Sequence, residues 1–239
     1  MHWVASINGM ACLVQIYPIH SWDLDPTAAV ALQKDLAGQI DVRSPLRHCE
    51  LIAGADVSYN RFSPLLYAAV VVLRMDGTIV EVQEAVGEAT FPYRSGLLTF
   101  REAPILLEAF AKLNSEPDAI MLDGQGIAPP RRFGLAAHIG LLLNKPCLGC
   151  AKSRLTGKFK EPKSRAGFIS PLLDKDGEII GNVVRTKDNV KPVFVSSGHR
   201  IDLPSAVRMV LATCRGYRIP EPTRQAHLHV TALRRRAGG

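Results

Sequence analysis

The chain has 239 residues, of which 47% are hydrophobic and only 6% aromatic, which gives enough Leu, Val, Ile and Ala for one sizeable core. This composition argues against a disordered or fibrous chain and suits an α/β domain. The formal net charge of +7 favours a polyanionic partner, because Lys and Arg release counterions when they neutralise phosphates, although an ordinary basic protein carries the same charge.

Residues 1–20 are mildly apolar, but they lack a basic start and contain Asn8, Gln15 and Pro18, so they do not resemble a signal peptide. Elsewhere no segment approaches the roughly 18 consecutive apolar residues of a membrane span. We therefore expect residues 1–20 to be an N-terminal extension, and the protein to be cytoplasmic with no membrane association.

The predicted elements begin with a helix over residues 26–40, where apolar residues recur at helical spacing after the capping residue Asp25. Three strands follow, and a tight turn at Asp76-Gly77 joins the second of these strands to the third. In chain order these elements are strands over 51–59, 67–73 and 79–86, a helix over 97–113, a strand over 119–122, a helix over 133–143 and a strand over 146–150. This order predicts an antiparallel three-strand meander followed by parallel strands, in a mixed sheet flanked by helices.

Beyond Ser153 the pattern is looser. It indicates short strands over 168–172, 178–184 and 193–195, and then two helices over 205–214 and 223–233. No internal repeat is visible, and no Pro/Gly/Ser linker is long enough to separate domains. We therefore expect residues 21–239 to form a single catalytic domain.

The five cysteines are an odd number for a chain of this length, which argues against a disulfide scaffold. Cys147 and Cys150 form a lone CxxC inside the apolar run 146–151. No second pair follows at the spacing of a zinc site, so a buried strand is a better interpretation of this segment than a zinc or redox site.

Three acidic residues have apolar neighbours in the sequence. Asp56 lies inside Leu-Ile-Ala-Gly-Ala-Asp-Val, where an unpaired buried charge would cost several kcal/mol. Asp123 ends a predicted strand, at the sheet edge where ligand sites gather in α/β folds. Glu102 falls on the apolar face of the helix predicted over 97–113.

Each carboxylate also has a purely structural interpretation. Asp56 could accept backbone hydrogen bonds, Asp123 could open a turn, and Glu102 could close a capping box with Thr99. Together they predict more, because carboxylates from a strand, a helix and a strand end of one sheet can converge on one point. Their repulsion there requires a divalent cation, and hard oxygen ligands select Mg²⁺, or Mn²⁺ as its substitute, over zinc. Because such a cation promotes phosphodiester hydrolysis, a basic protein with this cluster is predicted to be a nuclease.

A family resemblance supports this interpretation. Residues 91–102 read Phe-Pro-Tyr-Arg-Ser-Gly-Leu-Leu-Thr-Phe-Arg-Glu, which resembles the endonuclease V signature Pro-Tyr-x-x-Gly-x-Leu-x-Phe-Arg-Glu. The similarity continues through residues 123–126, 130–134 and 149–153, and includes the strand around Asp56 and the tail 219–227. It covers residues 22–227 in family order, and it implies a ribonuclease H-like fold.

The resemblance also implies roles for individual residues. Asp56, Asp123 and Glu102 would be the metal ligands and catalytic carboxylates. His227 would approach the metal site, where a neutral imidazole can bind the ion or move a proton. Lys152 follows a predicted strand and could contact the scissile phosphate, although a surface lysine is the simpler interpretation.

The resemblance further implies that Pro92 and Tyr93 form a wedge, whose planar ring replaces an extracted base and offsets part of the cost of unstacking it. The flipped hypoxanthine would lie in a pocket of small residues and backbone amides. The positions that match this pocket are Gly96, Leu98, Gly124, Gly134, Leu135 and Gly149. Glycine suits close backbone approach to a base edge, although each glycine could also serve a turn.

Two positions depart from the family pattern. Ser95 stands where proline is common, two positions after the wedge tyrosine, and Pro129 stands where many members have histidine. Neither change touches the acidic residues, so we expect catalysis to survive while substrate preference can differ.

The leading hypothesis is a Mg²⁺-dependent DNA-repair endonuclease that cuts 3′ to deoxyinosine, one nucleotide beyond the lesion, and leaves 3′-hydroxyl and 5′-phosphate ends. The alternatives are an inosine-specific or structure-specific ribonuclease, another ribonuclease H-like nuclease, and a non-catalytic nucleic-acid-binding protein. The expected partner is inosine-containing DNA or RNA, a choice that the residues leave open because a 2′-hydroxyl contact cannot be recognised in them. We expect the protein to be a monomer.

Overall fold

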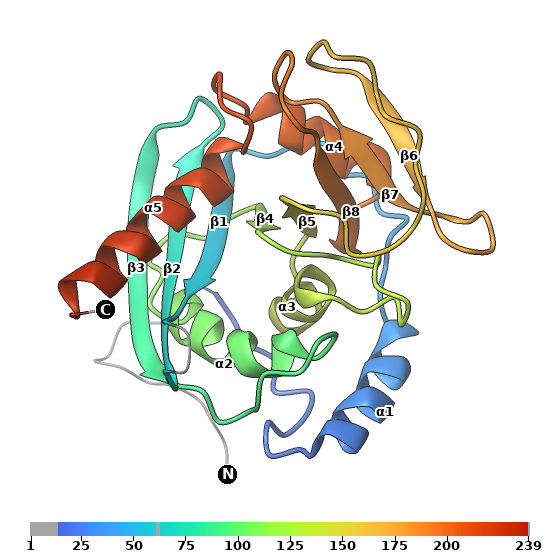
Figure 1. Ribbon diagram of the computed structural model, residues 1–239. Coiled ribbons are helices and arrows are strands. Elements are labelled where there is room, and N and C mark those ends of the chain that lie inside the picture. Colours follow the sequence, from blue (N-terminus) through green and yellow to red (C-terminus); the bar gives the residue numbers. More distant parts are fainter. Residues whose placement is uncertain (1–13, 61–62, 239) are drawn as a thin grey trace.

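The computed structural model describes residues 14–60 and 63–238. Within these residues, eight strands form a mixed sheet in the order β3-β2-β1-β4-β5-β8-β7-β6 (Figure 1). The strands are β1 (Leu51–Ser58), β2 (Leu65–Arg74), β3 (Ile79–Glu88), β4 (Ala119–Leu122), β5 (Cys147–Ala151), β6 (Ile169–Leu173), β7 (Ile179–Val184) and β8 (Val193–His199). Strands β1, β2 and β3 are the predicted antiparallel meander, and β1, β4 and β5 are parallel neighbours. The predicted α/β fold with a mixed sheet is confirmed.

Five helices flank the sheet: α1 (Pro26–Ala37), α2 (Leu98–Phe110), α3 (Leu135–Leu143), α4 (Leu203–Ala212) and α5 (Glu221–Arg236). Alternate residues of β1 face opposite sides, as the period of two requires. Ala53 and Ala55 belong to the core that includes α2 and α3, whereas Ile52 packs in the core that includes α4. Figure 1 shows α5 lying across β1 and β2 on the side opposite to α2. Asp56 therefore shares the α5 side of its strand with Ile52 and Gly54.

The first helix ends earlier than predicted, at Ala37 instead of residue 40. Gly38 follows as the C-cap, and the amide of Gln39 donates to the carbonyl of Leu36, so the chain turns away there.

Part of the predicted N-terminal extension lies against the core. Val14 is buried, and the amide of Tyr17 donates to the carbonyl of Leu142 over 2.7 Å. Residues 1–13 of that extension lie outside the described residues. In the described ranges, no helix has the length and apolar content needed to cross a membrane.

The last strand in chain order, β8, is longer than the predicted segment 193–195. It continues through Ser196 and Ser197 to His199, and all of these residues are buried. The hydroxyl of Ser196 accepts a 2.8 Å hydrogen bond from the amide of Gly126. This buried polar partner explains why the polar extension of the strand was missed by a search for apolar runs. The CxxC segment forms β5 as predicted, and burial raises the pKa values of the Cys147 and Cys150 thiols.

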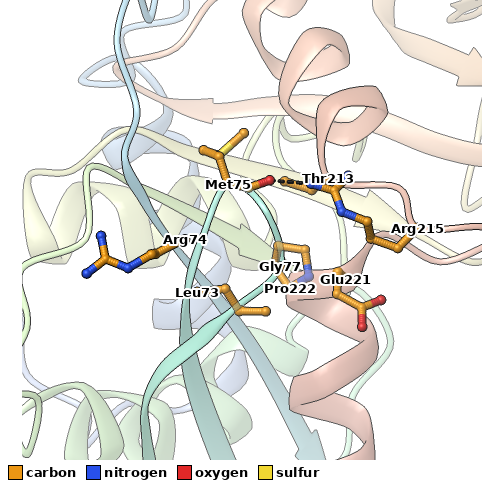
Figure 2. Close-up of a pocket in the computed structure, with 8 residues that line it drawn as sticks. All are labelled: Leu73, Arg74, Met75, Gly77, Thr213, Arg215, Glu221 and Pro222. Atoms are coloured by element: carbon orange, nitrogen blue, oxygen red, sulfur yellow. Dashed lines mark hydrogen bonds between the residues drawn. The ribbon is translucent and has the colours of Figure 1, made fainter.

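Helix α5 and the segment that precedes it both contact the sheet. A Cβ built on Gly54 of β1 would lie 1.9 Å from the carbonyl oxygen of Pro222, so the helix backbone directly touches the strand. In the segment between α4 and α5, the Arg215 guanidinium donates to the carbonyls of Met75 and Asp76 in the β2–β3 turn, as Figure 2 shows for Met75. The close contact at Gly54 sets the distance of α5 from β1, and therefore the position of the side chains that α5 presents to Asp56.

We predict that Gly54→Ala destabilises the protein by about 1–3 kcal/mol or more, because the new methyl group overlaps rigid backbone and not a movable side chain. Gly38→Ala is the matched control, since a Cβ there has 3.6 Å to its nearest neighbour and the φ of −68° suits alanine. Urea unfolding measures both variants. Equal urea midpoints for Gly54→Ala and Gly38→Ala would show that the α5–β1 contact is not tight.

Candidate functional site

Asp56 lies near the end of β1 with only 13% of its side chain exposed. Its Oδ2 is 2.8 Å from Nδ1 of His227 on α5, and its Oδ1 accepts a hydrogen bond of 2.9 Å from the amide of Val57. Burial and the nearby charge of Asp123 raise the pKa of the Asp56 carboxyl, while His227 and Lys152 act against this rise. The side chain of His227 is 52% exposed, so its ring links a buried carboxylate to solvent.

Asp123 follows β4, the strand next to β1, and its side chain is 15% exposed. The ammonium group of Lys152, which follows β5, forms an ion pair with Oδ2 of Asp123. Because β1, β4 and β5 are parallel neighbours, their carboxyl ends bring Asp56, Asp123 and Lys152 to the same edge of the sheet.

Glu102 reaches this edge from the first turns of α2 and is partly buried. Burial, and then the charges of Asp56 and Asp123, raise the pKa of its carboxyl to about 7, against a smaller opposing effect of Arg101. Helix α2 begins at Leu98, its N-cap residue is Leu97, and no side chain of the described residues caps it, so the Thr99–Glu102 capping box considered from the sequence is not formed. Burial is the largest cause of this rise, and the added effects of Asp56 and Asp123 show that the three acidic groups lie near one another, as the sequence predicts.

The three carboxylates are close enough to repel one another, but among residues 14–60 and 63–238 no set of three Asp, Glu, His or Cys side chains already encloses a metal position. Lys152 and His227 are the groups that pair with Asp123 and Asp56 instead. The donor set nevertheless fits a hard divalent cation, because it offers carboxylate oxygens from three separate elements whose mutual repulsion a cation would relieve.

The predicted wedge lies at the start of the segment that leads into α2. Pro92 and Tyr93 are exposed, and the Tyr93 side chain is accessible over 62% of its surface. Tyr59, just beyond β1, was not singled out from the sequence. The pKa of its hydroxyl is raised by burial and by the nearby Glu102 and Tyr93, and its ring lies 5.6 Å from the Arg101 guanidinium. Tyr59 therefore lies close to both Tyr93 and Glu102.

Five of the six residues predicted to line the base pocket fall into two groups, one buried and one partly exposed. Gly134 and Gly149 are buried, and a Cβ on Gly149 would lie 2.5 Å from the carbonyl oxygen of Gly124. A Cβ on Gly134 would be 2.4 Å from the carbonyl of Gln125, so both glycines allow backbone segments to touch. Leu98, Gly124 and Leu135 are partly exposed, and Gly124 lies against the Leu135 side chain. The structure therefore joins these segments next to Asp123.

Gly96 is exposed and has a φ of +79°, a conformation that favours glycine. Its carbonyl accepts hydrogen bonds from Arg131 at 2.7 Å and from Gln33 at 3.1 Å. Gln33 is buried, and its amide oxygen accepts from Arg131 as well. This clamp was missed from the sequence, although a glutamine on the apolar face of the first helix was a visible signal for it.

Comparisons with known proteins agree with this geometry. The endonuclease V family profile matches residues 34–228. An endonuclease V from Dehalococcoides mccartyi is 48% identical over 221 residues, which are 92% of this chain and 99% of that protein. The crystal structure of the Streptomyces avermitilis endonuclease V is 39% identical, with a TM-score of 0.87 over 95% of this chain and 99% of that one. The Ciona intestinalis endonuclease V, solved with DNA containing an inosine followed by a ribo-adenosine, is 28% identical, with a TM-score of 0.75 over 87% and 96% of the two chains.

We predict that Glu102→Gln raises the thermal stability of the metal-free protein, and that the gain is larger at about pH 8 than at about pH 5, on the two sides of the Glu102 titration. The pKa of Glu102 rises from 4.5 to about 7 on folding, so the folded state prefers the protonated form. The ionised Glu102 carboxylate therefore begins to destabilise the folded protein as the pH rises past its pKa in the unfolded chain, and this loss of stability is complete above its pKa in the folded protein. Glutamine removes it.

The matched control is Glu108→Gln, on the exposed side of the same helix. Thermal melting with a chelator present measures both variants at both pH values. A Glu102→Gln gain that is equal at the two pH values would contradict the clustering of the carboxylates.

Proposed function

The chain belongs to the endonuclease V family and is a DNA-repair nuclease, and we propose that it hydrolyses the phosphodiester bond one nucleotide 3′ to deoxyinosine. The observation that supports this assignment most directly is the gathering of Asp56, Glu102 and Asp123 at one sheet edge, where their charges interact. The inosine-containing DNA bound by the Ciona protein supports the choice of lesion.

We propose that Asp56, Asp123 and Glu102 hold Mg²⁺, with Mn²⁺ as a substitute. The cation would supply charge neutralisation and water activation for hydrolysis. Lys152 pairs with Asp123 in this structure. With Asp123 held by a cation instead, the Lys152 ammonium would contact the scissile phosphate and stabilise the charge that develops on it.

His227 is proposed as a positioning and proton-moving residue. Its Nδ1 faces Asp56, and its exposed ring presents the other nitrogen toward solvent. A histidine that is fixed by a carboxylate on one side can hold or pass a proton on the other. The products expected from this chemistry are 3′-hydroxyl and 5′-phosphate ends, with the base left on its sugar.

Tyr93 is proposed as the wedge that takes the place of the extracted base. Its high exposure leaves the ring free to enter a duplex, and the hydrogen bonds from Arg131 and Gln33 to the Gly96 carbonyl hold the loop on which it stands. The hypoxanthine would then lie among Gly96, Leu98, Gly124, Gly134, Leu135 and Gly149, where the backbone segments meet. A base edge can be recognised there by backbone amides without side-chain interference.

The first test is cleavage of matched strands that contain inosine or adenosine at one position. In Mg²⁺ or Mn²⁺ we expect a single cut, one nucleotide 3′ to inosine, and no cut in the adenosine strand. A chelator or the substitution Asp56→Ala should reduce the rate by at least about a hundredfold, since the loss of one ligand removes the cation that hydrolysis needs.

The same series should include an inosine strand with a ribonucleotide on its 3′ side, because the Ciona complex contains that arrangement. Faster cutting of the ribonucleotide strand would identify RNA as the better substrate. No cutting of any inosine strand by the wild-type protein would refute the proposed function.

The second test concerns the wedge. Tyr93→Ala should lower cleavage of inosine in a duplex by about tenfold or more, because the loss of the ring leaves the unstacking cost unbalanced. Tyr93→Phe keeps the ring and should retain most of the activity. The loss should be smaller on a single strand, where less stacking is broken. An equal loss on both substrates would argue against a wedge.

A further inference from the structure

An open cleft of about 550 Å³ lies next to the catalytic residues, on the side away from Tyr93. Its lining includes Lys152, Phe159, Lys191, Phe194 and Arg218. Lys152 is shared with the candidate site, because its ammonium contacts Asp123. The cleft is therefore continuous with the position of the scissile phosphate.

The sheet order places the cleft relative to the lesion. Tyr93 belongs to the segment between β3 and α2 and lies close to Tyr59, just beyond the end of β1, and β1 and β5 are on opposite sides of β4. The cleft lies on the other side, where Phe194 of β8 pairs with Ala151 of β5, directly before Lys152. A strand that places inosine beside Tyr93 and its cut at Asp123 therefore continues toward this cleft on its 3′ side.

The segment that borders the cleft is strongly basic. Residues 152–165 contain six Lys or Arg residues and a single acidic one. That acidic residue, Glu161, forms a 2.7 Å ion pair with the buried Arg185, so its charge is neutralised locally. The exposed cations of the segment are thus left to attract phosphates.

The cleft also offers an aromatic surface. Phe159 is partly exposed, and its ring meets the buried Phe194 edge-on, with centroids 5.4 Å apart. The Arg154 guanidinium lies 5.8 Å from the Phe159 centroid. An aromatic ring supported from one side and flanked by arginine is the arrangement on which single-stranded bases stack.

The walls of the cleft are held by Arg218. Its guanidinium donates to the backbone carbonyls of Lys152, Lys191 and Pro192, the last two over 2.8 and 2.9 Å. These bonds connect the end of β5 to the segment before β8. The cleft is therefore formed before a ligand arrives, which reduces the entropy lost on binding.

We propose that this cleft binds the single-stranded nucleotides on the 3′ side of the cut, with a base stacked on Phe159 and a phosphate at Lys191. The inference rests on the proposed function, because the cut position sets the direction of the strand. The cleft is then a second binding surface, which contacts the product strand on the 3′ side of the cut, in addition to the site that holds the lesion.

The test compares inosine strands whose 3′ arm is long with strands that end just beyond the cut. For Lys191→Glu we expect KM to rise about tenfold on the long 3′ arm, with kcat unchanged, because a phosphate contact becomes a repulsion. On the short 3′ arm the variant and the wild type should not differ. Changing the length of the 5′ arm should not alter the effect of the substitution.

Two controls accompany this series. Arg47→Glu reverses an exposed charge that precedes β1, at the opposite end of the strand from Asp56, and should leave KM unchanged on every substrate. Phe159→Leu should raise KM on the long 3′ arm, whereas Phe159→Tyr, which keeps the ring, should restore it.

Equal KM values for Lys191→Glu and wild type on the long 3′ arm, with normal cleavage, would overturn the inference while the proposed function stands. A dependence on the 5′ arm instead would also overturn it, since the strand would then run the other way. If the wild type cleaves no inosine strand, the proposed function fails. The cleft is then tested by the affinity of an unmodified single strand, which Lys191→Glu must weaken if the cleft binds nucleic acid.

Discussion

Three carboxylates that share a partly buried sheet edge carry a free-energy cost, because each is short of water and close to charges of its own sign. In this protein Lys152 and His227 offset part of that cost through their contacts with Asp123 and Asp56. Among residues 14–60 and 63–238, Arg101 is the cation that acts on Glu102, and it does not prevent the pKa of Glu102 from rising to about 7. The site is therefore poised to accept positive charge, whether from a bound cation or from a proton.

The fold maintains this unfavourable cluster through close backbone contacts. Gly54 lets α5 touch β1, and this contact fixes the position of His227 relative to Asp56. On the other side of the cluster, Gly126 and Gly149 let the loop after β4 pack directly on β5 and β8. Backbone contacts of this kind deform less than side chains do, so the carboxylates cannot move apart to relieve their repulsion.

The resulting arrangement is linear along the sheet edge. Tyr93 lies close to Tyr59, just beyond β1, the carboxylates are in the middle, and Lys152 leads to the basic cleft beyond β5. The proposed function requires the same order along one nucleic-acid strand, from the damaged base, through the bond to be cut, to the segment downstream. Lys152 connects the last two, since it touches Asp123 and also lines the cleft.

The sequence by itself determined the order and type of the elements, since hydrophobic periodicity and the Gly, Pro and Asp-Gly signals are local properties of the chain. It also indicated Asp56, Glu102 and Asp123, because a carboxylate among apolar neighbours is unusual wherever it occurs. Only the tertiary structure decided what these groups touch: the pairing of His227 with Asp56, the ion pair of Lys152, the Gln33–Arg131 clamp and the cleft held by Arg218. These contacts join residues 29 to 171 positions apart. No local pattern encodes them, because they depend on how whole strands and helices pack together.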